Sequence, residues 1–172
     1  MKKLFVLMLI FFFSSLLLGQ VSPEEAIPAI ESSGILSSVD EAPLTFSEFK
    51  TAVEKAFPGK GEVIEGVGEV SRADFAVAMV EVLNLKSEAD AYDEICTTAL
   101  DEWDAPKEAW GALTVAYRSN HQLLDFRYGH VIEADSPITR KEAAISIYMA
   151  LNPPVTGGLA TTAVTADAPG FN

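Results

Sequence analysis

Two arginines stand where residue type and spacing suit chemistry, each directly after a Ser or Thr. The phrases Thr139-Arg140-Lys141-Glu142 and Ser71-Arg72-Ala73-Asp74 both carry an acid three residues after the hydroxyl. That spacing predicts a capping box, in which the hydroxyl and the acid satisfy free N–H groups at a helix start. A helix start also attracts anions, and the planar guanidinium of an arginine beside it can hold a carboxylate through two hydrogen bonds. Each phrase therefore has groups that are able to hold a carboxylate.

A third phrase, Thr45-Phe46-Ser47-Glu48, keeps the hydroxyl and the acid but has Phe46 in place of the arginine. Apolar residues follow all three phrases at spacings of four, as expected on one face of a helix. Three boxes with the same register behind them indicate an internal repeat. The box explains the hydroxyl and the acid, and it leaves Arg72 and Arg140 without a structural reason. The alternative for each arginine is a solvated side chain that pairs with nearby acids.

The elements that must position these phrases are helices. The pattern predicts helices over residues 23–32, 45–57, 71–83, 87–103, 106–120 and 139–151. Pro58 and Pro153 end the first and third phrase helices, because proline cannot continue the hydrogen-bond ladder. The glycine-rich stretch 58–70 predicts a loop or a short β excursion. The expected fold is mainly α: a small bundle of helix-loop-helix repeats in residues 20–152.

The two ends of the chain lie outside this predicted domain. Met1-Lys2-Lys3 and the apolar run after it, up to Gly19, have the form of a secretory signal peptide over residues 1–19. The alternative is a retained membrane anchor, but the run of apolar residues is shorter than the ~20 that a spanning helix needs. Residues 153–172 are small and polar without periodicity, which predicts a flexible, disordered tail. The sequence thus favours an exported protein with no membrane span after cleavage.

Composition excludes several function classes. The formal net charge of −13 opposes binding to nucleic acid or anionic lipid. A single cysteine, Cys96, allows no internal disulfide, and its apolar stripe predicts a core position. The two histidines, His121 and His130, have no partners at metal-ligand spacing, so we expect no metal and no cofactor. No nucleophile or phosphate-binding motif is present, and an enzyme would need an acid pair that nothing in the sequence nominates.

The phrases resemble those of the S-layer homology family. Pro137-Ile138-Thr139-Arg140-Lys141-Glu142 is similar to the phrase that opens the family's second helix, and Asp104-Ala105-Pro106 with Trp110 is similar to the start of its first. Tyr128-Gly129-His130-Val131 resembles its glycine loop. The resemblance is close over residues 104–151 and looser over two degenerate units, in which the front copy lacks the arginine. It implies helical repeats with pseudo-symmetry.

The resemblance also implies a function. Such modules hold exported proteins to the cell envelope by binding acidic cell-wall polysaccharide, without catalysis. It implies six ligand-binding residues: Arg140, Thr139, Arg72, Ser71, Trp110 and Gly129. The alternative for Trp110 is a core or groove-wall position. The alternative for the whole chain is a periplasmic or secreted helical module that binds a protein partner or itself, with the repeats as scaffold only.

Overall fold

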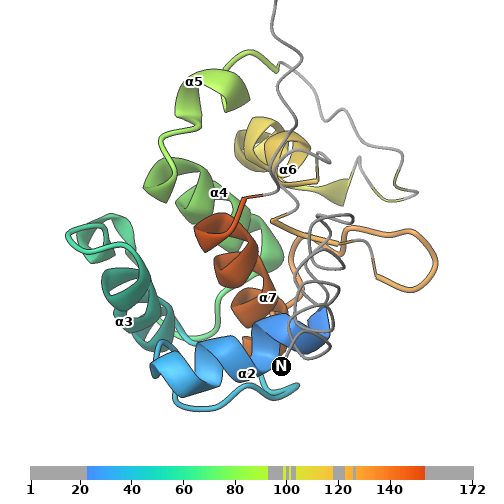
Figure 1. Ribbon diagram of the computed structural model, residues 1–172. Helices are drawn as coiled ribbons and strands as arrows, with labels where there is room; N and C mark the ends of the chain where they lie inside the picture. The colour runs from blue at the N-terminus through green and yellow to red at the C-terminus, as the bar shows by residue number, and fades with distance from the viewer. Residues whose placement is uncertain are drawn as a thin grey trace, which may run out of the picture.

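The computed structural model describes residues 23–92, 99, 101, 104–117, 123–125 and 127–153. The predicted signal peptide, Cys96, His121 and all of the predicted tail except Pro153 lie outside these residues. Within the described residues the chain is mainly helical, as predicted, and forms a small bundle without β-strands (Figure 1).

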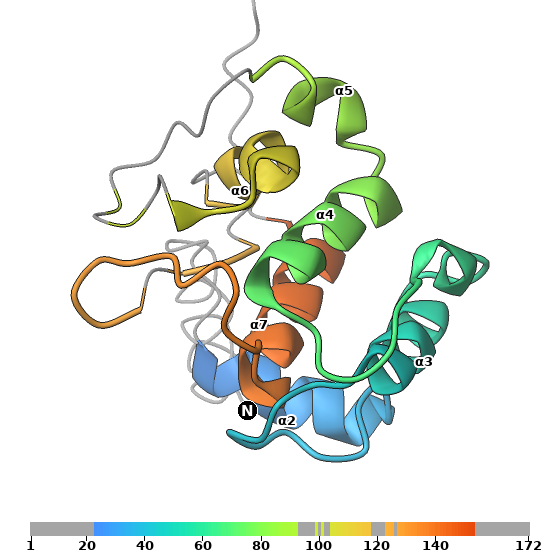
Figure 2. The ribbon, with the colours of Figure 1, turned by 180° about the vertical axis from the view of Figure 1, so that it is seen from behind.

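Six α-helices and two 3₁₀ turns make up the described fold. They are α2 (Pro23–Ser33), α3 (Phe46–Ala56), η1 (Gly61–Val63), α4 (Arg72–Val82), α5 (Lys86–Ala89), η3 (Lys107–Ala109), α6 (Trp110–Ala116) and α7 (Arg140–Leu151). The helix α2 packs against α7, and α6 packs against α4 and α5 (Figures 1 and 2).

The three phrases start α3, α4 and α7, as the capping pattern predicts. Thr45 and Thr139 are N-caps of complete capping boxes, in which the glutamate three residues later returns a hydrogen bond to the cap. Ser71 also caps its helix, and its hydroxyl accepts from the Asp74 amide. The shorter Asp74 side chain instead accepts a hydrogen bond from the Ser71 hydroxyl, at 2.7 Å.

The three helix starts meet through the residues that precede the caps. The amide of Leu44 donates to the carbonyl of Ile138, Ile138 donates to Val70, and Val70 donates back to Leu44, each at 2.9 Å. All three side chains are fully buried. This closed cycle of backbone hydrogen bonds joins segments that are far apart in the sequence and fixes the three helix starts around one point.

A second set of backbone bonds repeats the same relationship one step outward. The amides of Phe46, Arg72 and Arg140, the first residues of the three helices, donate to the carbonyls of Gly68, Ser136 and Ala42 at 3.0 Å. These amides belong to a helix start and have no partner within their own helix. The loop before the next phrase therefore satisfies each of them, so the phrases position one another.

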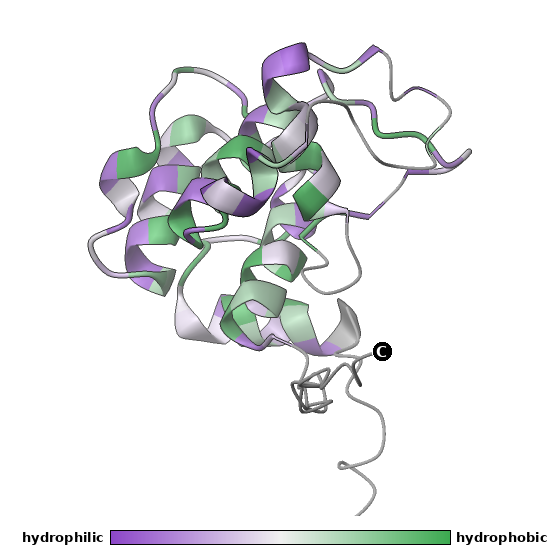
Figure 3. Cartoon of the chain, turned by 90° about the horizontal axis from the view of Figure 1, so that it is seen from above, coloured by the Kyte–Doolittle hydropathy of each residue, from purple (hydrophilic) through white to green (hydrophobic). Residues whose placement is uncertain are grey.

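Apolar faces of the helices bury the core around this hub. Phe49 of α3 and Phe75 of α4 stack with ring centroids 4.9 Å apart, and both are fully buried. Figure 3 shows hydrophobic and hydrophilic residues sharing the same helices, as expected where one face of each helix is buried. Burial of these faces supplies the main driving force for folding in a chain whose single cysteine allows no internal disulfide.

Two predicted helices differ from the observed ones. The predicted helix over residues 87–103 is cut short, since α5 ends at Ala89 and neither Tyr92 nor Ala99 is helical. The predicted helix from Pro106 begins as the 3₁₀ turn η3 and continues as α6 to Ala116. The apolar spacing over 87–103 was thus a misleading sign of a continuous helix.

Candidate functional site

Arg140 lies at the start of α7 and reaches across to the start of α3. Its Nε and Nη2 donate to one oxygen of Glu48, at 3.0 and 2.7 Å, and its Nη1 lies 3.2 Å from a carboxylate oxygen of Asp40. The Arg140 side chain is 22% exposed and that of Asp40 is 50% exposed. The predicted ligand-binding arginine therefore lies at the surface with its guanidinium already held by two acids.

Arg72 occupies the matching position on α4 but is buried, with 1% of its surface exposed. Its guanidinium donates to the carbonyls of Ile132 and Asp125, to the hydroxyl of Tyr117 and to the carboxylate of Glu142. A group so enclosed cannot meet a polymer in solution. The structure thus gives Arg72 a role in holding the fold, in place of the ligand contact that the sequence suggested.

The two arginines stand in the same relation to their neighbours. Arg140 of the third phrase pairs with Glu48, the capping acid of the first, and Arg72 of the second phrase pairs with Glu142, the capping acid of the third. An arginine in the first phrase, paired with Asp74 of the second, would complete a cycle of three ion pairs. Phe46 stands there, and its ring lies where a Cβ on Gly66 would come within 2.5 Å of it. The third ion pair is thus replaced by an aromatic ring laid on a glycine.

Arg127 is a member of this network that the repeat pattern did not reveal. Its guanidinium donates to Glu142 at 3.1 Å, to Glu133 at 2.6 Å and to the carbonyl of Pro137 at 2.8 Å. Glu142 therefore lies between Arg127 and the buried Arg72. Nothing in the phrase spacing places an arginine at this position, since Arg127 comes from the loop before α7.

These partners change the acidity of the capping acids. Partial burial alone would raise the pKa of Glu142, but hydrogen bonds from Arg127 and the Thr139 amide, with the charge of Arg72, hold it below the ordinary value. Burial opposes the same shift at Glu48, whose pKa is lowered by hydrogen bonds from Thr45 and Arg140. Both carboxylates stay ionised near neutral pH, so both ion pairs persist there.

Thr139 and Ser71, the other predicted contacts at the helix starts, use their hydroxyls locally. Each hydroxyl accepts the amide of the residue three positions later, at 3.1 Å in α7 and 3.0 Å in α4. Their cap role is therefore confirmed, and the hydroxyl oxygen of each is already engaged. The predicted ligand contact at these two residues remains a prediction.

Trp110 lies on α6, and Gly129 lies in the turn that follows Arg127. Trp110 is half-buried at the start of α6, its indole N–H donates to the carbonyl of Ala105 at 2.9 Å, and the Lys107 ammonium lies 5.7 Å from its ring centre. The helix α6 packs on α4 and α5, whereas Arg140 starts α7, which packs on α2 and α3. Gly129 lies in an exposed turn with φ of +89°. Trp110 thus starts a helix whose neighbours differ from those of the helix that Arg140 starts.

No group of three or more His, Cys, Asp or Glu side chains in the part of the chain that the structure describes could hold a metal ion. No helix there is long and apolar enough to span a bilayer. Comparisons with family models, with curated proteins and with solved structures found no match to this chain.

Proposed function

We propose that this chain is an exported, non-catalytic module that attaches to acidic cell-wall polysaccharide through the start of α7. The observation that carries the proposal is the position of Arg140, at the N-terminal end of α7 with 22% of its side chain exposed. An arginine beside a helix start is the arrangement that proteins use to hold carboxylates. The resemblance of its phrase to the S-layer homology family supports the same ligand class.

The acids around Arg140 suggest how the polymer binds. Glu48 holds the guanidinium through two nitrogens and is itself anchored in a capping box, so it fixes the orientation of the group. Asp40 is more exposed and lies farther away, at 3.2 Å. A carboxylate of the glycan takes the place of Asp40 on Nη1, while Glu48 keeps the guanidinium in position. Asp40 is then an internal competitor for the ligand.

The proposal includes the repeat relationship of the three phrases. We infer an approximate threefold relation between them, supported by the closed backbone cycle through Leu44, Ile138 and Val70. Only one of the three helix starts then offers an exposed arginine, because Arg72 is buried and the first phrase carries Phe46. A single binding position per chain is the expected result.

A second function is favoured by one specific observation. Arg140 pairs with Glu48 in the same way that the buried Arg72 pairs with Glu142, so Arg140 has a structural partner of its own. If that pairing is its whole role, the repeats are a scaffold and the module binds a protein partner. The two functions predict different behaviour toward isolated cell wall.

The test is co-sedimentation of the purified mature protein with isolated wall, before and after chemical removal of the polysaccharide. We expect binding to intact wall, loss of binding to stripped wall, and loss of binding by Arg140→Ala with an unchanged helical circular dichroism spectrum. Binding that survives stripping, or an Arg140→Ala protein that binds like wild type, would contradict the proposal and favour the scaffold.

A further inference from the structure

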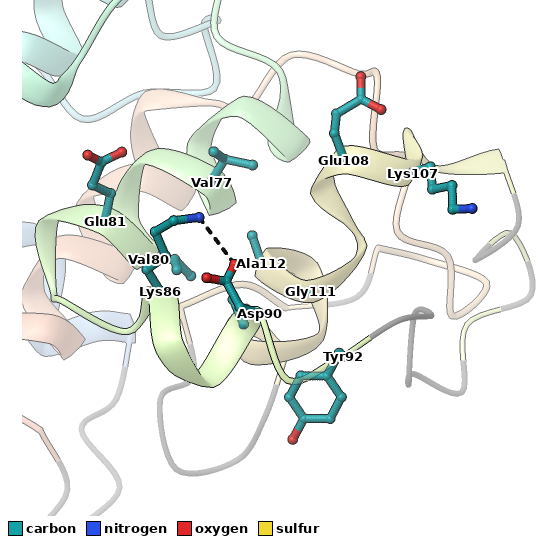
Figure 4. Close-up of a pocket in the computed structure, with 11 residues that line it drawn as sticks. Val77, Val80, Glu81, Lys86, Asp90, Tyr92, Lys107, Glu108, Gly111 and Ala112 are labelled. Carbon is teal, nitrogen blue, oxygen red and sulfur yellow. Dashed lines mark hydrogen bonds and ion pairs between the residues drawn. The ribbon is translucent and has the colours of Figure 1, made fainter.

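A cavity of about 300 Å³ lies between α4, α5 and α6, away from the start of α7 (Figure 4). One side of it depends on Gly111 in α6. A Cβ at that position would lie 2.2 Å from the carbonyl oxygen of Ala89, the last residue of α5. Only glycine allows the end of α5 to approach α6 this closely, and this close contact forms one side of the cavity.

The cavity combines apolar walls with polar groups of both signs. Val77 and Val80 of α4, with Tyr92 after α5, contribute apolar surface. Tyr92 also has an aromatic ring with a polar end, a combination that suits ligands with one apolar and one polar face. The volume is at the small end of the ~300–1,000 Å³ range of small-ligand pockets, which suits a single ring.

Charged side chains line the same cavity from opposite sides. Lys86 and Asp90 form an ion pair at 3.1 Å, which Figure 4 draws as a dashed line, and Lys107 and Glu108 come from the turn η3. Glu81 of α4 adds another carboxylate. The Lys86–Asp90 pair places a donor and an acceptor side by side, whereas the side chains of Glu81, Lys107 and Glu108 point away from it (Figure 4). A ligand with a full charge of either sign is repelled by one member of this pair.

We propose that this cavity binds one ring of a neutral, polyhydroxylated ligand, a sugar unit. Hydroxyl groups both donate and accept hydrogen bonds, so they can bond to Lys86 and Asp90 together, while the apolar face of the ring lies on Val77 and Val80. The inference rests on the proposed function for the source of the sugar, a neutral unit of the same wall polysaccharide. Arg140 then binds an acidic group of the polysaccharide, and the cavity binds a neutral sugar unit elsewhere on the same polysaccharide.

The test uses free sugars as probes. Glucose, N-acetylglucosamine and glucuronic acid are titrated into ¹⁵N-labelled mature protein, and amide shifts are followed by NMR. We expect saturable shifts at Gly111 and Ala112 with a neutral sugar, at the millimolar affinity expected of one ring. Val77→Tyr places a larger side chain on the cavity wall at a position that is 41% exposed, and should weaken binding about tenfold or more. Val67→Tyr, at an exposed position elsewhere, is the matched control.

Each outcome decides the proposal. Neutral-sugar shifts that are lost in Val77→Tyr and kept in Val67→Tyr and Arg140→Ala support it. The absence of shifts with both neutral sugars, shifts that survive Val77→Tyr, or tighter binding of glucuronic acid at these amides would overturn it. The two proposals can fail separately, because Arg140 does not line the cavity. If the protein binds isolated wall but no neutral sugar, only the sugar site is rejected. If it binds a neutral sugar in the cavity but not isolated wall, only the proposed function is rejected.

Discussion

Arg140 hydrogen-bonds to Glu48 through two of its nitrogens, at 3.0 and 2.7 Å, although 92 residues separate the two in the chain. The pair links the first residue of one helix to the capping acid of another. Arg72 and Glu142 repeat the link, 70 residues apart, with the arginine buried. Glu48 and Glu142 thus each have two roles: each caps its own helix, and each accepts hydrogen bonds from the arginine of another phrase.

The first prediction concerns Arg72→Met, a substitution that keeps the apolar stem and removes the charge. It leaves the buried carbonyl of Ile132 without its donor and takes one of its two arginine partners from Glu142, so we expect a loss of about 3–5 kcal/mol in the free energy of unfolding. Arg140→Met is the matched control at the equivalent, more exposed position, and it should cost much less. Urea denaturation measures both. Equal losses would show that burial does not separate the two arginines.

The second prediction concerns the missing third ion pair. Phe46→Arg combined with Asp74→Glu restores the residue types found at the other two positions. Phe46→Arg alone should destabilise the protein, because an aromatic contact with Gly66 is lost. The double variant should recover about 0.5 kcal/mol or more of coupling energy in a double-mutant cycle. A coupling of zero would indicate that the first and second phrases are not placed like the other pairs.

The third prediction concerns acid unfolding. The pKa of Glu142 in the folded protein lies below 4.5, its ordinary value, so its contribution to stability is complete above that pH and is lost as the pH falls further. The pKa of Glu48 is also lowered, so its contribution to stability is lost over the same range of falling pH. In Glu142→Gln the fall in stability below pH 4.5 should be shallower than in wild type. The slope of unfolding free energy against pH measures it, and an unchanged slope would mean that Glu142 titrates normally.

Local signals in the sequence were enough to predict much of the fold. A hydroxyl followed by an acid three residues later is a property of neighbours along the chain, and it predicted where α3, α4 and α7 begin. Pro58 and Pro153 predicted where two of them end. The helix expected over residues 87–103 was wrong, because apolar spacing alone does not show that a helix ends at Ala89.

The partners of the arginines could not be predicted in this way. Arg72 and Arg140 look alike in sequence, and only the packing of distant segments makes one fully buried and the other partly exposed. Arg127 lies in no repeated phrase, yet it shares Glu142 with Arg72. The phrases marked the right helix starts, but they did not show that the arginine of the second phrase is buried.

The most direct test of the central claim is the affinity of Asp40→Asn for isolated cell wall. The asparagine keeps an oxygen that can accept the Ala42 amide but removes the carboxylate that competes with the ligand for Arg140. Glu62→Gln, which removes the acid of another exposed ion pair, controls for net charge. We expect tighter binding by Asp40→Asn than by wild type or Glu62→Gln, and loss of that gain in the double variant with Arg140→Ala. Weaker or equal binding by Asp40→Asn would contradict the central claim.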